Sequence, residues 1–159
     1  YQVTNALTAI EALTCAGVTP AHIAMGIERA RIPARMELLP GDILLDGGHN
    51  PQAARAVRSA LEDSGYERRT AFIGMMNTKD HRAFLQEILP CFDRVYFCDG
   101  FSEGEVPAEE LRRISGLDGA EIFHSPREAL KFARRDHEGG LMYFGGSFYF
   151  AAAVREYLV

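Results

Sequence analysis

The sequence predicts an α/β domain built on a mainly parallel sheet of five or six strands flanked by helices, preceded by two further helices. Five short runs of apolar, aromatic and β-branched residues recur along the chain, and each is followed by a stretch with helical patterning. Continuously apolar runs are typical of strands buried on both faces. Because strands and helices alternate, the connections are expected to be βαβ crossovers, which produce parallel strands.

The elements follow one another in a regular order. The expected strands span residues 42–46, 70–75, 94–99, 120–124 and 141–145. The expected helices span residues 51–64, 80–90, 107–115, 126–137 and 147–158. At the starts of the first and fourth of these helices, Asn50-Pro51 and Ser125-Pro126 supply an N-cap residue followed by a first-turn proline. Glu128 completes a predicted capping box with Ser125.

The amino-terminal part has a different organisation. Residues 2–15 and 20–30 are expected to form two helices joined around Gly17, and residues 36–45 a small hairpin that turns at Pro40-Gly41. We therefore expect a boundary near Ile32-Pro33. Together with its linker, the first part spans residues 1–34, and the second part spans residues 35–159. The chain does not begin with Met, which suggests a piece of a longer protein.

Composition excludes several classes of protein. A net charge of −5 without a lysine or arginine cluster argues against binding to duplex nucleic acid. No apolar run approaches 18 residues, so no membrane segment is expected. Cys15, Cys91 and Cys98 are odd in number and fit no CxxC pair, which favours buried, reduced thiols and a cytoplasmic location.

Polar and small residues follow the expected strands at the edge where open parallel sheets bind ligands. Asp46 and His49 follow the first strand, Lys79 follows the second, and Gly146-Ser147 follow the last. Each has an ordinary alternative, because a glycine permits a turn, a histidine can be structural, and a lysine or arginine can be a solvated charge. The sequence has no GxxxxGK[ST] and no GxGxxG after the first strand, which argues against a self-sufficient nucleotide hydrolase or dehydrogenase.

Four motifs in order resemble a known family. "ARMELL", "ILLDGGHNPQAARAV", "FIGMMNTKD" and "GGSFYFAAAVREYL" are similar to the GRxE, DGAHNP, G-x-M-x-x-KD and GSLYL patterns in the carboxy-terminal domain of folylpolyglutamate synthase and dihydrofolate synthase, members of the Mur ligase family. The departures are Ala34 for glycine, Gly48 for alanine and Phe148 for leucine. Ala34 would restrict the interdomain hinge if glycine's backbone freedom is used there.

The resemblance implies that two domains contribute different parts of the active site. Residues 35–159 correspond to a Rossmann-like domain that closes over the nucleotide, and residues 1–34 to the last helices and linker of an upstream ATP-binding domain. In the family that upstream domain carries the P-loop and the magnesium ligands, so no metal ligand is expected in this chain. The chain alone is accordingly expected to be inactive.

The resemblance also implies roles for individual residues. The family's ATP contacts correspond to Asn5, Arg35 and Asp46. The groups that face the reaction centre correspond to His49 and Ser147, and substrate binding is expected of Lys79, Gly146 and Ser147.

The implied reaction is an ATP-dependent amide ligation. ATP with Mg²⁺ phosphorylates a carboxylate of folate or dihydropteroate, and the amine of glutamate then attacks the acyl phosphate. Whether the parent enzyme makes dihydrofolate, extends a polyglutamate tail or does both is left open. Two other readings also stay open, namely another Mur-type amino-acid ligase and a non-catalytic α/β ligand-binding module.

Overall fold

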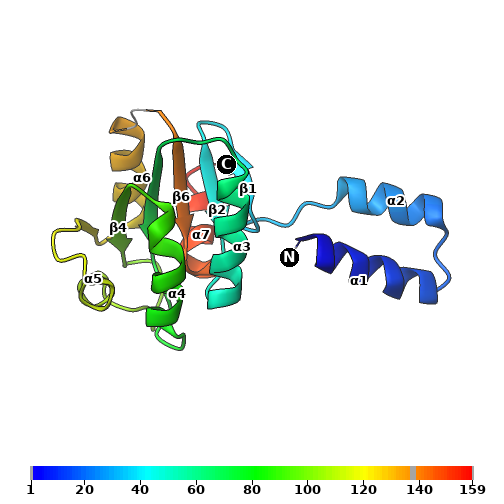
Figure 1. Ribbon diagram of the computed structural model, residues 1–159, viewed down its shortest axis with the longest axis horizontal. Helices are drawn as coiled ribbons and strands as arrows, with labels where there is room; N and C mark the ends of the chain where they lie inside the picture. Colours follow the sequence, from blue (N-terminus) through cyan, green and yellow to red (C-terminus); the bar gives the residue numbers. More distant parts are fainter. Residues whose placement is uncertain (1, 137–138, 159) are drawn as a thin grey trace. The chain divides into compact units, whose positions relative to one another are not determined.

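The computed structural model describes residues 2–136 and 139–158, and the chain divides into two compact units between Ile32 and Pro33. The first unit contains helices α1 (Gln2–Cys15) and α2 (Pro20–Arg29), which lie side by side (Figure 1). Thr19 caps α2, since its side chain accepts a hydrogen bond from the backbone N–H of His22. Within the described part of the chain, no helix has the length and apolar character needed to cross a membrane.

The second unit is built on a six-stranded sheet in the order β1-β2-β6-β3-β4-β5 (Figure 1). The strands are β1 (Glu37–Leu39), β2 (Ile43–Asp46), β3 (Arg69–Ile73), β4 (Arg94–Cys98), β5 (Ile122–Phe123) and β6 (Leu141–Gly145). Strand β1 pairs antiparallel with β2 and forms the predicted hairpin, and all other pairings are parallel. The predicted fold class is therefore confirmed.

Helices cover both faces of this sheet. They are α3 (Pro51–Glu62), α4 (His81–Ile88) with the short 3-10 turn η1 (Leu89–Cys91), α5 (Ala108–Ser115), α6 (Pro126–Arg135) and α7 (Phe148–Arg155). Helices α3, α4 and α5 pack on one face, and α6 and α7 pack on the other. Both faces are buried, which explains why the strands are continuously apolar rather than alternating.

Successive strand residues point to opposite faces and fill two separate cores. On β6, Tyr143 packs with the core under α3–α5, whereas Phe144 packs with the core under α6 and α7. In the second core the Phe72 ring stacks between Tyr96 and Phe144, with centroid distances of 4.9 and 4.6 Å. These aromatic contacts join the three central strands β6, β3 and β4.

Helix capping agrees with the sequence prediction at Asn50 and differs from it at Ser125. Asn50 accepts a hydrogen bond from the backbone N–H of Ala53 and so caps α3, as predicted. Asp80 caps α4 in the same way. The predicted capping box at Ser125 is wrong, because Ser125 makes no side-chain cap hydrogen bond. Its extended backbone and the fixed φ of Pro126 start α6 instead.

The three cysteines carry free thiols in different surroundings. Cys98 is buried at the end of β4, and burial raises the pKa of its thiol. Cys91 is half-buried, whereas Cys15 at the end of α1 is exposed. The expectation that all three would be buried is wrong for Cys15, because a pair of helices can cover only the side of each that faces the other.

Candidate active site

Strands β2 and β6 end at the same level of the sheet, since Asp46 pairs with Gly145. The chain leaves β2 toward α3 on one face of the sheet and leaves β6 toward α7 on the other. In open α/β sheets, ligands bind where neighbouring strands send their helices to opposite faces. The structure therefore brings the predicted segments 46–49 and 146–147 together at a place suited to a ligand.

Asp46 holds the end of β2 in place. Its side chain is fully buried at 0% exposure, and Oδ1 accepts a hydrogen bond of 2.8 Å from the backbone N–H of Gly48. Oδ2 accepts a second hydrogen bond of 2.9 Å from the backbone N–H of Met36. Asp46 thus ties the turn after β2 to the segment before β1. Its contact with ATP stays a prediction, and the geometry adds a role in positioning Arg35.

The segment that carries Arg35 has an unusual backbone. Ala34 and Met36 both have positive φ values, 53° and 52°, a conformation that costs an L-residue about 1–2 kcal/mol. Two hydrogen bonds hold Ala34 there: its N–H donates to the Glu37 carboxylate at 2.8 Å, and its carbonyl accepts from the N–H of Gly47 at 2.7 Å. Ala34 therefore occupies the backbone region that glycine adopts without strain.

Glu37 is a site-forming residue that the sequence reasoning missed. Besides accepting from Ala34, its carboxylate forms an ion pair of 3.1 Å with Arg155 of α7. The pair joins the segment before β1 to the helix that follows β6. The sequence signal for this residue is the glutamate of the "ARMELL" motif, which lies two positions after Arg35.

Arg35 lies over the ring of Phe148, with its guanidinium carbon 4.0 Å from the ring centroid. Such a cation–π contact orients the guanidinium while leaving its edge able to donate hydrogen bonds. A Cβ atom on Gly47 would collide with the same ring. Arg35, Gly47 and Phe148 therefore meet at one point, although the sequence reasoning treated Phe148 only as a departure from the family pattern.

The loop after β6 is tightly built. Ser147 is 3% exposed and caps α7, since its Oγ accepts a hydrogen bond of 3.1 Å from the N–H of Tyr149. Gly146 has a φ of 98°, and a Cβ atom there would come within 2.9 Å of the Gly74 carbonyl oxygen. Across the edge, half-buried His49 places Nδ1 3.3 Å from the Gly47 carbonyl oxygen.

The remaining predicted residues lie on other elements. Lys79 is half-buried in the connection between β3 and α4, and β3 is the neighbour of β6 in the sheet. Lys79 thus belongs to the same edge. Asn5 lies exposed on α1 in the other unit, and its role in ATP binding stays a prediction.

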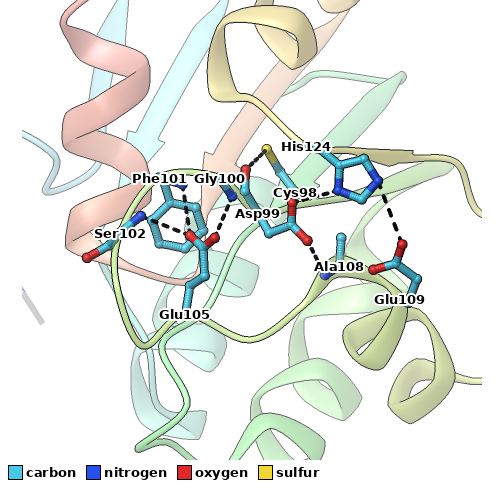
Figure 2. Close-up of polar contacts among 9 residues, drawn as sticks. All are labelled: Cys98, Asp99, Gly100, Phe101, Ser102, Glu105, Ala108, Glu109 and His124. Carbon is cyan, nitrogen blue, oxygen red and sulfur yellow. Dashed lines mark hydrogen bonds and ion pairs between the residues drawn. The ribbon is translucent and has the colours of Figure 1, made fainter.

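A second polar cluster lies at the ends of β4 and β5 (Figure 2). His124 Nδ1 is 2.8 Å from Asp99 Oδ1, and His124 Nε2 is 3.7 Å from Glu109 Oε1. The other oxygen of Asp99 accepts from the N–H of Ala108 at 2.8 Å and so supports the start of α5. Potential metal-ligand atoms of Asp99, Glu109 and His124 lie within 4.8 Å of one another, but these groups already engage each other as an ion-pair network.

The pairing makes the stability of the fold depend on the protonation of His124. The hydrogen bond and the charge of Asp99 raise the pKa of His124, and Glu109 and Glu128 act in the same direction. A raised folded-state pKa stabilises the fold fully below the ordinary histidine pKa of about 6.5, and this stabilisation is lost as the pH rises through the folded-state pKa.

We expect an NMR titration of His124 to give a pKa above that of an unperturbed histidine, and Asp99→Asn to lower it. Asn keeps an acceptor for the N–H of Ala108, so this hydrogen bond at the start of α5 can still form. Asp63→Asn, at the end of α3, serves as the control and should leave the His124 titration unchanged. An equal pKa in the wild type and Asp99→Asn would contradict the assignment.

Comparison with known proteins shows which family the chain is similar to. The family model described as "Mur ligase, glutamate ligase domain" matches residues 34–148. The chain is 34% identical over 123 residues to a probable bifunctional folylpolyglutamate synthase/dihydropteroate synthase of Halobacterium salinarum, covering 76% of this chain and 15% of that protein. It is 29% identical over 150 residues to folylpolyglutamate synthase of Lacticaseibacillus casei, covering 89% of this chain and 33% of that protein.

A solved structure gives the same result for the fold. FolC of E. coli in complex with DHPP and ADP has a TM-score of 0.87 and 28% sequence identity, covering 96% of this chain and 38% of that chain. The chain thus spans 38% or less of the length of these relatives. The motif order, the shared fold and the matched domain agree, and the chain belongs to the Mur ligase family, with the glutamate ligase domain of the folylpolyglutamate synthase type.

Proposed function

We propose that this chain is the carboxy-terminal part of an ATP-dependent ligase that joins glutamate to folate or dihydropteroate through an acyl phosphate. The observation that carries the proposal is the meeting of Arg35, Gly47 and Phe148 between the ends of β2 and β6, next to His49 and Ser147. All of these residues lie within the matched ligase domain, whereas helices α1 and α2 lie before it.

Arg35 is proposed to bind the phosphates of ATP. A guanidinium carries a fixed charge and donates paired hydrogen bonds in a plane, which suits phosphate oxygens. Its place on Phe148 restricts the guanidinium before the nucleotide arrives, so less freedom is lost on binding. Arg35 then stabilises charge that develops on the transferred phosphoryl group.

The opposite loop is proposed to hold the substrates. The backbone around Gly146 and Ser147 lies at the start of α7, where unpaired N–H groups favour a carboxylate. Lys79 adds a positive charge from the neighbouring strand end. Together with His49 after the end of β2, these groups would align the glutamate amine with the acyl phosphate and keep water out.

We further propose that an upstream domain completes the site. Asp46 is buried with both oxygens bonded to backbone N–H groups, so it is poorly placed to take a metal ion. We propose that the Mg²⁺ that neutralises the phosphates binds to ligands of the upstream domain. Residues 1–34 would be the last helices and linker of that domain, with Asn5 as a further ATP contact.

The test is ligation by the complete protein compared with this chain alone. We expect the complete protein to release ADP only when Mg²⁺, glutamate and folate or dihydropteroate are all present, and this chain to release none. ATP-dependent transfer of glutamate by this chain alone would contradict the proposal that an upstream domain is needed to complete the site. ADP release with a different amino acid would identify another Mur-type ligase, and no binding of ATP, glutamate or folate in calorimetry would support the non-catalytic module.

A further inference from the structure

The connection between β4 and α5 is organised around one carboxylate. Glu105 accepts hydrogen bonds from three consecutive backbone N–H groups, those of Gly100 at 2.6 Å, Phe101 at 2.8 Å and Ser102 at 2.9 Å (Figure 2). Successive N–H groups that converge in this way form an anion-binding nest. The side chain of Glu105 therefore fills a nest made by its own loop. We call residues 99–106 the β4 loop.

The β4 loop is attached to the segment that carries Lys79. Glu105 forms an antiparallel bridge with Met76, and the N–H of Asn77 donates to the Gly104 carbonyl at 3.0 Å. The N–H of Val106 donates to the carbonyl of Met75 at 2.8 Å. The backbone just before Lys79 is thus held by the same loop that Glu105 organises.

The β4 loop also supports the loop after β6. The ring of Phe101 lies against Gly74, where a Cβ atom would come within 2.7 Å of it, and 5.3 Å from the ring of Phe150 on α7. Gly74 in turn lies against Gly146, the residue before Ser147. Phe101 therefore packs against Gly74, which in turn contacts Gly146.

We propose that Glu105 is a positioning residue for the ligation reaction, a role that rests on the proposed function. Its carboxylate fixes the β4 loop, and the loop holds both the Lys79 segment and the backbone before Ser147. Glu105 acts through these residues and does not touch the substrates. A carboxylate suits the task because both of its oxygens accept, and hydrogen bonds to a charged acceptor are the stronger ones.

Glu103 provides a matched control within the same loop. It carries the same charge two positions away, but its side chain is exposed. Substitution of Glu103 therefore changes the loop's charge without emptying the nest. Glu105→Gln keeps the size and one acceptor oxygen, so its effects should lie between those of the wild type and Glu105→Ala.

The first measurement uses the chain as it is and does not depend on activity. In amide hydrogen exchange by NMR, Glu105→Ala should speed exchange at Gly100, Phe101, Ser102 and Asn77 by about tenfold or more. Glu103→Ala should leave these rates within about twofold of the wild type. Unchanged exchange in Glu105→Ala would overturn the proposed organisation of the loop.

The second measurement uses the complete enzyme. Glu105→Ala should raise KM for glutamate by about tenfold while leaving KM for ATP within about twofold, because Arg35 lies on another segment. Glu105→Gln should raise KM for glutamate less than Glu105→Ala does, and Glu103→Ala should leave both KM values close to those of the wild type. Since a merely structural role would lower the melting temperature without this split, equal effects on both KM values, or none, would overturn the positioning role.

The exchange and kinetic measurements together show whether the proposed function or the positioning role of Glu105 is wrong. If the wild-type complete enzyme shows no ATP-dependent ligation, the proposed function and the positioning role fall together, whereas the exchange result still decides whether Glu105 organises the loop. If ligation is observed and exchange changes but KM for glutamate does not, the proposed function stands and the positioning role is wrong.

Discussion

Replacing Asp46 with alanine should lower the free energy of unfolding of this chain by about 2–4 kcal/mol. The substitution leaves two backbone N–H groups without their acceptor, that of Gly48 in a buried position and that of Met36 in a half-buried one. Each such loss costs about 1–3 kcal/mol when water cannot replace the partner. The expected loss is large because one side chain satisfies both groups.

Urea unfolding monitored by circular dichroism measures this effect. Asp46→Asn should fall between the wild type and Asp46→Ala, because an amide offers one acceptor oxygen and turns its NH₂ group toward the other N–H donor. Asp118→Ala removes an acid of the same charge from an exposed position and should change stability by less than about 0.5 kcal/mol. A loss below about 1 kcal/mol in Asp46→Ala would contradict the structural role of its carboxylate.

Replacing Arg35 with alanine in the complete enzyme should lower kcat/KM for ATP by about 100-fold or more. The substitution removes the fixed charge and the planar donors proposed for the nucleotide phosphates. The free energy of unfolding should fall by about 0.5–2 kcal/mol, the range expected for a half-buried cation–π contact. Arg35→Lys keeps the charge but loses the paired donors, so it should recover only part of the activity.

Steady-state kinetics at limiting and saturating ATP measure this prediction. Arg127 offers a matched control, because its guanidinium also lies over an aromatic ring, that of Tyr157, at 5.9 Å, but on the exposed surface of α6. Arg127→Ala should retain wild-type kinetics. Kinetics of Arg35→Ala that match the wild type at both ATP concentrations would remove Arg35 from the ATP site.

The arrangement of elements could be predicted because it depends on local patterns. Strands buried on both faces must be apolar throughout, and the strand spanning Leu141–Gly145 was located to the residue on that basis. Asn50-Pro51 marked the start of α3 because a cap and a first-turn proline act within a few residues. The capping box at Ser125 failed because the same spacing allows a helix start without the side-chain hydrogen bond.

The candidate site was predicted only in part. His49 and Ser147 could be assigned to one edge, because parallel strands place their carboxyl ends together. The sequence did not reveal the residues that hold this edge of the sheet in place. Glu37, Phe148 and Glu105 contact segments that are distant along the chain, and no spacing along the chain reports such contacts.

The sequence alone determined the alternation of strands and helices, the edge of the sheet that carries the polar residues, and the family motifs found there. The tertiary structure decided which contacts hold those residues in place. The sequence predicts Asp46 as an ATP contact, and the fold adds a second role, because its buried carboxylate ties β2 to the segment carrying Arg35. The physical reason is that hydrophobic periodicity is a property of neighbours in sequence, whereas the partner of a buried carboxylate is set by which backbone N–H groups the packed loops bring within reach.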